Sequence, residues 1–272
     1  MKTIEDSKTR PSPFPFLRGW IFMGIIVGVT PALLSAAWRK APNSAFVVGE
    51  ELIFDVGWKS ASAGEMRMKV KGIASRKNRP AYQIALELST NRVVDAIFEL
   101  RNRYESWMDV DSLMSVGSSI QTQEGPRKKV GTVFYDPLTG RYKSRTFRPG
   151  KDSSPKNEEG VAFPLAQDIA SALYYVRTQP LAVGGTLTFP ILNGTQSLRI
   201  QIRVLRRDKV VFQGREWPCL VLEPLIETDS GFARNPKVSA TLWVTDDARH
   251  WPLKLVATTF VGDVGATLRS VK

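Results

Sequence analysis

Apolar and polar residues alternate along many short runs of this chain from residue 46 onward. The run ELIFDVGW, residues 51–58, puts Leu52, Phe54 and Val56 on one face and charged residues on the other. The runs EMRMKVK, YQIALEL and SLRIQIRV repeat the same two-residue period. A parallel sheet would show continuous apolar runs separated by long amphipathic helices, and the chain has neither. The pattern therefore predicts antiparallel strands that bury one face and expose the other.

Turn-forming residues separate these runs at the spacing of hairpins. In YDPLTGR, Pro137 supplies the fixed φ of a type I turn, and Gly140 supplies the positive φ that ends it. The segments VGG, LNGTQ and FQGRE indicate further turns of the same kind. Residues 148–160 are polar and rich in Pro, Gly and Ser, so we expect a mobile loop there.

One helix is indicated, in QDIASALYYVRTQP. Asp168 is its expected N-cap, Ile169, Leu173 and Val176 follow at helical spacing, and a proline stands just beyond its end. The sequence therefore predicts a mainly β fold: a strongly curved antiparallel sheet that forms a closed or partly open barrel, with this one short helix. Barrel closure limits the number of exposed strand edges.

The first forty residues have the composition of an export signal. A leader with four basic residues precedes an uninterrupted apolar run, residues 20–34, and the small residues SAA follow it. The run has the length of a signal-peptide core and is short for a membrane span, which needs about 20 residues. We predict that residues 1–40 are a cleaved signal peptide, with an uncleaved inner-membrane anchor as the alternative. Residues 41–272 then form a single β-barrel-like domain in the periplasm.

The chain carries 38 Lys and Arg against 26 Asp and Glu, a formal net charge of +12. Such an excess attracts anionic partners, and export favours an anionic membrane surface or acidic envelope polymers over nucleic acid. The alternative is that the charge only keeps the domain soluble. The candidate contacts with an anionic surface are basic residues on the solvent-facing side of two predicted strands, Arg67, Lys69, Lys71, Arg199 and Arg203.

The only histidine, His250, lies in TLWVTDDARHWPLKLV beside two aspartates and an arginine. The run fits a hairpin that sets Val244 opposite Trp251 and Thr245 opposite His250, with His250 on the solvent-facing side. The two aspartates suit the turn because their side chains bond nearby backbone amides. We therefore interpret this stretch as a turn and not as a catalytic cluster.

Other catalytic and metal-binding patterns are also missing from the sequence. A zinc site needs more His or Cys ligands than the chain offers, and no Gly-x-Ser-x-Gly elbow is present. Cys219 has apolar neighbours and is expected to be a small buried hydrophobe. Paired acids such as Asp109 and Asp111 are expected to be solvated. We predict no cofactor, no metal and no catalytic residue, so that the protein is not an enzyme.

Four segments in order resemble the bacterial domain-of-unknown-function family 3108. They are FVVGEELIFDVGWKSASAGEMRMKV, RNRYESWMD, SALYYVRTQPLAVGGTL and the run from GREWPCLVLEP to VGDVGATL, and together they cover most of residues 46–272. The resemblance implies an exported envelope protein and brings no activity or catalytic residues. The chain has no lipobox cysteine and departs there from the lipoprotein members.

Three functions fit these observations. The favoured one is a non-enzymatic periplasmic protein that binds an apolar or amphipathic envelope component, a lipid or a glycan, in the curved sheet. The alternative is a structural interaction module of an envelope protein complex, with surface aromatics such as Trp243 as contacts. An envelope hydrolase or transferase would require a convergent set of ionisable groups, which the sequence does not reveal.

Overall fold

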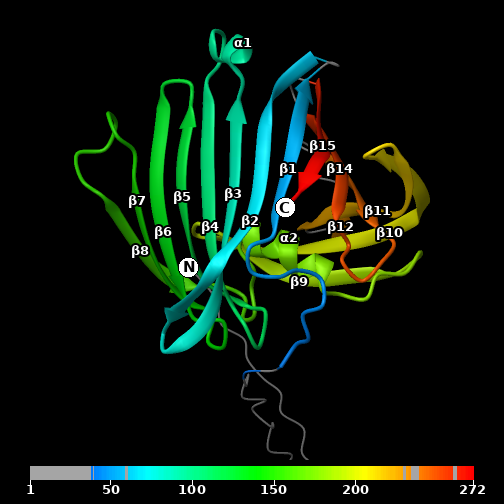
Figure 1. The fold of residues 1–272 in the computed structure, drawn as a ribbon. Helices are drawn as coiled ribbons and strands as arrows, with labels where there is room; N and C mark the ends of the chain where they lie inside the picture. The colour runs from blue at the N-terminus through cyan, green and yellow to red at the C-terminus, as the bar shows by residue number, and fades with distance from the viewer. Residues whose placement is uncertain (1–37, 39, 59–60, 229–230, 234–238, 260–261) are drawn as a thin grey trace, which may run out of the picture. The chain divides into compact units, whose positions relative to one another are not determined.

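The alternating runs fold as the strands of one antiparallel sheet in the computed structural model (Figure 1). The structure describes residues 38, 40–58, 61–228, 231–233, 239–259 and 262–272. The predicted signal or anchor segment therefore lies almost entirely outside the described residues. The strands are β1 (Glu51–Trp58), β2 (Ala61–Arg76), β3 (Arg79–Thr90), β4 (Leu100–Asp109), β5 (Ser115–Glu124), β6 (Arg127–Tyr135), β7 (Arg141–Phe147), β8 (Lys156–Val161), β9 (Thr186–Asn193), β10 (Gln196–Phe212), β11 (Arg215–Thr228), β12 (Gly231–Ala233), β13 (Ser239–Thr245), β14 (Pro252–Thr259) and β15 (Gly262–Val271).

Most strands pair with their neighbours in sequence, as a chain of hairpins does. The order across the sheet is β8-β7-β6-β5-β4-β3-β2-β1-β15-β14-β13-β11-β10-β9, and β12 pairs with β11. The pairing of β1 with β15 joins the first and last strands. The turn before β7 follows the prediction, since Gly140 has φ +73 and an added Cβ there would lie 2.2 Å from the carbonyl oxygen of Ala162. The predicted loop over residues 148–160 is shorter than expected, because β8 begins at Lys156.

In the described part of the chain, the segment that follows β8 bridges the two ends of the sheet, β8 and β9. The backbone N–H of Gln167 donates to Pro190 O at 2.9 Å, and its carbonyl oxygen accepts from Leu192 N at 2.8 Å. Among the described residues no ladder of hydrogen bonds joins β8 to β9. The sheet is therefore strongly curved and barrel-like but not closed, and the closed alternative of the prediction was wrong.

The apolar faces of the strands turn to the concave side of the sheet and form the core. Leu52 and Phe54 of β1 and Ile84 of β3 are at most 1% exposed. The helix α2 (Ile169–Arg177) lies on this side and contacts β3, β4 and β9 (Figure 1). The apolar half of the concave side is thus filled by packed side chains.

The start of α2 agrees with the prediction, and its buried face differs from it. The side chain of Asp168 accepts hydrogen bonds from two backbone N–H groups of the first turn, as an N-cap does. Val176 is buried, as its spacing predicted. However, Tyr174 and Arg177 are at most 2% exposed, whereas Ile169 and Leu173 are only half-buried. An arginine on the innermost face was not expected from the apolar spacing.

A second helix, α1 (Arg92–Asp95), was not predicted. It lies in the connection between β3 and β4, at one end of the sheet (Figure 1). The side chain of Asn91 caps it by accepting from the backbone N–H groups of Val93 (3.1 Å) and Val94 (3.0 Å). The structure therefore has two helices within its described residues, one more than expected.

The hairpin around His250 has a different register from the predicted one. Val244 pairs with Pro252 and not with Trp251, because a bulge shifts the strands beside it. His250 adopts φ +42, and its Nδ1 lies 2.8 Å from the carbonyl oxygen of Arg177. A carbonyl oxygen only accepts, so this nitrogen carries the proton. The solvent-facing placement of His250 was wrong, since the ring is half-buried against the end of α2.

Candidate functional site

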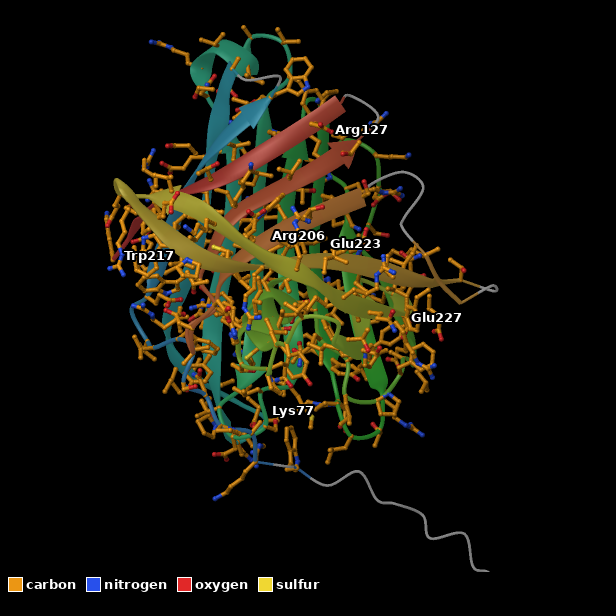
Figure 2. All side chains as sticks on the ribbon, turned by 90° about the vertical axis from the view of Figure 1, so that its right-hand side faces the viewer. Lys77, Arg127, Arg206, Trp217, Glu223 and Glu227 are labelled. Carbon is orange, nitrogen blue, oxygen red and sulfur yellow. The ribbon has the colours of Figure 1, made fainter. Side chains whose placement is uncertain are left out.

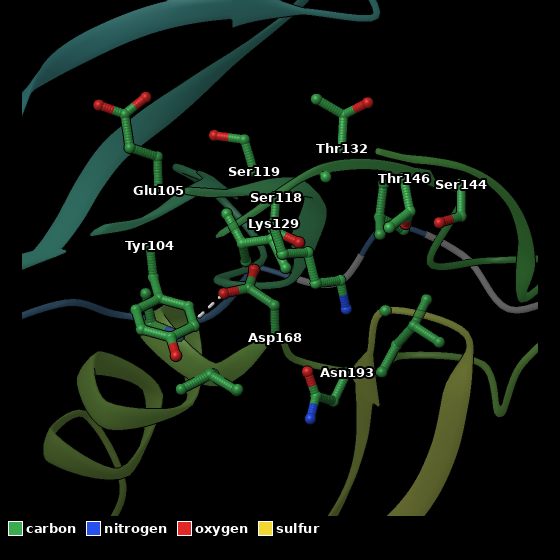
Figure 3. A pocket seen from close by; sticks show the side chains of 17 residues that line it. Tyr104, Glu105, Ser118, Ser119, Lys129, Thr132, Ser144, Thr146, Asp168 and Asn193 are labelled. Carbon is green, nitrogen blue, oxygen red and sulfur yellow. Dashed lines mark hydrogen bonds between the residues drawn. The ribbon is translucent and has the colours of Figure 1, made fainter. Parts of the chain in front are cut away.

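A pocket opens on the concave side, in the half of the sheet where that side is polar. It lies between strands β4 to β7, the first turn of α2 and the turn that joins β9 to β10 (Figure 3). The space between its walls is about 430 Å³ including the open mouth, but the enclosed part is only about 30 Å³. That is room for one or two water molecules, so the pocket can take a single small polar group of a ligand whose remainder lies at the mouth.

The strands present every second side chain to the pocket, because side chains alternate across a strand. Tyr104 of β4, Ser118 of β5 and Lys129 of β6 point toward it, whereas Glu105 and Ser119 point to the other side of the sheet (Figure 3). The strand β7 adds Ser144 and Thr146, and the β9–β10 turn adds Asn193. The wall is therefore rich in hydroxyl groups, with one amide and one cation.

The buried carboxyl of Asp168 forms the floor of this pocket. One oxygen accepts from the hydroxyls of Ser106 (2.5 Å) and Ser115 (2.6 Å). The other accepts from the backbone N–H groups of Ala170 (2.9 Å) and Ser171 (3.0 Å). Burial raises the pKa of Asp168 above its usual value, although these hydrogen bonds act in the opposite direction. The carboxyl fastens the first turn of α2 to β4 and β5 and so fixes the shape of the pocket.

Two ionisable side chains at the wall remain available to a ligand. Burial, and secondarily the charge of Glu124, raise the pKa of Tyr104, so its phenol is neutral and can both donate and accept. Lys129 is half-buried and lines the pocket, and no ion pair joins it to any carboxylate in the part of the chain that the structure describes. Its ammonium group is thus free to bind an anionic oxygen.

Replacing Asp168 by alanine is expected to lower the free energy of unfolding by about 2–4 kcal/mol, because the helix loses its cap and two buried hydroxyls lose their acceptor. Asp168→Asn keeps the cap acceptor and should cost less than half of that. Because the pKa of Asp168 is raised on folding, folded wild type binds the proton more tightly than unfolded chain does. Its stability relative to Asp168→Asn should therefore fall as pH rises from about 4.

Urea unfolding of wild type and Asp168→Asn between pH 4 and pH 7 measures this difference. The raised pKa of Asp168 is contradicted if the difference in free energy of unfolding between the two proteins does not change with pH. It is also contradicted if wild type gains stability relative to Asp168→Asn as pH rises.

The other end of α2 holds a buried ion pair. Arg177, 2% exposed, donates from two nitrogens to Glu50 at 2.7 and 2.9 Å. It also donates to the carbonyl oxygens of Ala45 (2.7 Å) and Arg249 (3.1 Å). The indole N–H of Trp251 reaches the same Glu50 carboxylate at 3.2 Å. This network connects α2, the start of β1 and the β13–β14 hairpin, and its groups face one another rather than an open cavity.

The five basic residues predicted to contact an anionic surface each lie in an ion pair. Glu223 and Glu227, two of their partners, lie along β11 (Figure 2). Such pairs at the surface stabilise the fold little, but they balance the positive charge of these strands. Contact of these five residues with an anionic surface stays a prediction. Their ion pairs weaken it, because each positive charge already has an acidic partner. The pairs are Arg67 with Glu65 and Glu51, Lys69 with Glu51, Lys71 with Glu105, Arg199 with Glu227, and Arg203 with Glu223.

The remaining sequence candidates occupy structural positions. Cys219 is fully buried, as predicted, and burial raises the pKa of its thiol to about 11. Asp109 is buried and not solvated as expected, since its carboxylate accepts from Arg79 at 2.6 and 3.0 Å. Trp243 is half-buried and donates to Asp208 at 3.0 Å. Among the described residues, no group of three or more His, Cys, Asp or Glu is placed to hold a metal ion.

The curved antiparallel sheet, the helix α2 on its concave side and the polar pocket together define a barrel-like protein of the mainly β class. The chain belongs to the family described as "Protein of unknown function (DUF3108)", whose model matches residues 53–269. This confirms the resemblance seen in the sequence. A comparison with curated proteins finds no match.

One solved structure supports the same fold. A beta-barrel-like protein of domain of unknown function DUF1849 from Brucella abortus is similar with a TM-score of 0.57 at 9% sequence identity. The similarity covers 84% of this chain and 99% of that one. A supposed exported protein with a YmcC-like fold from Bacteroides fragilis aligns over 87% of this chain and 100% of its own, at 8% identity and a TM-score of 0.28. In the described ranges no helix combines the length and the apolar character that crossing a membrane requires.

Proposed function

We propose that this chain is an exported, non-enzymatic binding protein of the bacterial cell envelope. Its pocket would take the anionic group of an envelope lipid head or of an envelope glycan, with the rest of the ligand at the open mouth. Export is supported by the basic leader, the apolar run and the small residues within the first forty positions.

The observation that carries the proposal is the chemistry of the pocket wall. Hydroxyls of Ser118, Ser144 and Thr146 can each donate and accept, which suits the hydroxyl groups of a sugar or glycerol. Lys129 adds one positive charge without an ion-pair partner among the described residues, and an ammonium group binds phosphate or carboxylate oxygens. The Tyr104 ring offers an apolar face beside these groups. A hydroxylated ligand with a negative charge matches this set.

The location of the pocket also decides which part of an amphipathic ligand it can take. The apolar part of the concave side packs on α2 and is filled by side chains such as Phe54 and Tyr174. The pocket lies where the strands present serine, threonine and lysine. We therefore assign the pocket to the head of the ligand and not to an acyl chain.

Native mass spectrometry of the full chain, purified from a bacterial envelope, tests this proposal. Wild type should carry an additional mass that fragments as an anionic lipid or glycan. Lys129→Ala removes a charge-assisted hydrogen bond, and it should weaken rebinding of the released species by about tenfold. With the released species and no bilayer present, Lys128→Ala is the matched control. Lys128 is exposed on the opposite face of β6, outside the pocket, so this variant should bind the species as tightly as wild type does.

Equal loss of binding in both variants, or a ligand held as tightly by Lys129→Ala as by wild type, contradicts the assignment. A protein free of any bound small molecule but accompanied by reproducible partner proteins would instead favour an envelope interaction module.

A further inference from the structure

The connection between β3 and β4 ends in an apolar projection that the core does not use. Val93 is 76% exposed, Ile97 is 84% exposed and Phe98 is 47% exposed. We call these three residues the apolar tip. All three lie in α1 or directly after it, in the connection between β3 and β4 at one end of the sheet (Figure 1). Several exposed apolar residues in one short projection mark a contact surface more often than an isolated exposed residue does.

The apolar tip is held in place by its neighbours. The backbone N–H of Gly125, in the β5–β6 turn, donates to the carbonyl oxygen of Glu99 at 2.7 Å. A Cβ at Gly125 would lie 3.2 Å from the ring of Phe98, so the turn and the ring are in contact. Asn91 caps α1, and Arg101 donates to Asp95 at 2.5 Å. The tip is therefore a built projection whose apolar side chains face solvent.

Basic residues surround the apolar tip. Arg92 lies within α1, and Arg127 and Lys128 follow the β5–β6 turn that touches Phe98. All three are exposed, and in the described part of the chain none of them has an ion-pair partner. We call these three residues the basic collar. The nearby acids Asp95 and Glu99 instead contact Arg101, and the exposed Glu124, opposite Arg127 in the β5–β6 pair, accepts from Asn102 at 3.1 Å.

The described N-terminal residues do not cover this end of the sheet. The ring of Trp38 lies 4.1 Å from the guanidinium carbon of Arg79, at the start of β3. The strand β3 has 12 residues and spans about 40 Å at roughly 3.4 Å per residue, with the apolar tip beyond its other end. In Figure 2, Lys77 lies toward one end of the domain and Arg127 toward the other.

We propose that the apolar tip and the basic collar form a docking surface for an anionic lipid bilayer. Apolar side chains that enter the headgroup region, flanked by Arg and Lys that meet anionic lipids, are the composition of an interfacial membrane contact. A protein partner would require about 800 Å² of complementary surface, whereas the tip is a small convex projection. This surface differs from the five paired basic residues on β2 and β10, and it does not depend on the pocket.

The test uses the full chain with Ile97→Cys, labelled with a dye whose emission shifts to the blue in an apolar environment. Cys219 is fully buried, so the labelled thiol is the introduced one. The emission should shift with vesicles of phosphatidylglycerol and phosphatidylcholine and not with phosphatidylcholine alone. Val211→Cys is the matched control, since Val211 is 64% exposed on β10, away from the tip. The dye at Val211→Cys should show no shift in emission, even if the N-terminal segment itself binds the vesicles.

A second set of variants tests the basic collar. In the Ile97→Cys background, Arg92→Gln, Arg127→Gln and Lys128→Gln together should raise the vesicle concentration for half-maximal shift at least about tenfold, because the attraction of three charges is lost. No shift at Ile97→Cys, an equal shift at Val211→Cys, or an equal response to neutral vesicles overturns the proposal. A shift that only an envelope protein produces overturns it as well.

Discussion

Replacing Glu50 by alanine is expected to lower the free energy of unfolding by about 3–5 kcal/mol. The change leaves the guanidinium of Arg177 buried without its carboxylate partner, and it also removes the acceptor of the Trp251 indole N–H. Taking one member out of a buried pair costs far more than the pair contributes, because the remaining charge has lost both solvent and counterion. Urea unfolding followed by tryptophan fluorescence measures the loss.

The double variant Glu50→Leu with Arg177→Met is the control for this prediction. It removes both charges and should lose less stability than either single variant, since an apolar pair avoids the desolvation of two ions. Two carbonyl oxygens, those of Ala45 and Arg249, would still lose a donor, so recovery should be incomplete. A double variant as unstable as the sum of the two single variants would show that the groups act independently.

Replacing Trp251 by alanine is expected to cost about 3 kcal/mol, the lower end of the cost of truncating a core tryptophan, because its ring is half-buried and packs against the core. The ring lies 6.2 Å from that of Trp217, and the guanidinium carbon of Arg249 lies 4.0 Å from its centroid. Its N–H also donates to Glu50. Trp251→Phe keeps most of the packing and loses only the hydrogen bond, so it should cost about 1.5–3 kcal/mol.

His250→Ala is the neighbouring comparison for Trp251. It removes one hydrogen bond to the carbonyl oxygen of Arg177 and should cost about 1 kcal/mol. If Trp251→Ala were as mild as His250→Ala in thermal or urea unfolding, the hairpin would not anchor the end of α2 as described.

The β strands could be predicted from the sequence because their alternation reports burial directly. Leu52, Phe54 and Val56 are buried where the period required it, and Asp168 caps α2 where the spacing placed the cap. The register at His250 could not be predicted. It depends on a bulge beside Val244 and on a positive φ at a residue that rarely adopts one.

The pocket and the buried pair could not be predicted for physical reasons. On β4 to β7 the inward-facing residues include Ser106, Ser118, Ser144 and Thr146, so part of the inward face of these strands looks solvent-facing in the sequence. Only the curvature of the sheet and the position of α2 enclose them. Glu50 and Arg177 are 127 residues apart, and no local pattern couples them. Likewise, the charge of Arg67 could be assigned to a strand face, but its pairing with Glu65 required the structure.

The most direct test of the proposed function is chemical labelling of lysines with and without the ligand that co-purifies with the protein. Lys129 and Lys128 are adjacent in sequence and lie on opposite faces of β6, so each is the reference for the other. Labelling of Lys129, quantified by peptide mass spectrometry, should be suppressed when the ligand is bound, while labelling of Lys128 should not change. A ligand that binds and leaves Lys129 as reactive as before, or that protects Lys128 instead, contradicts the account.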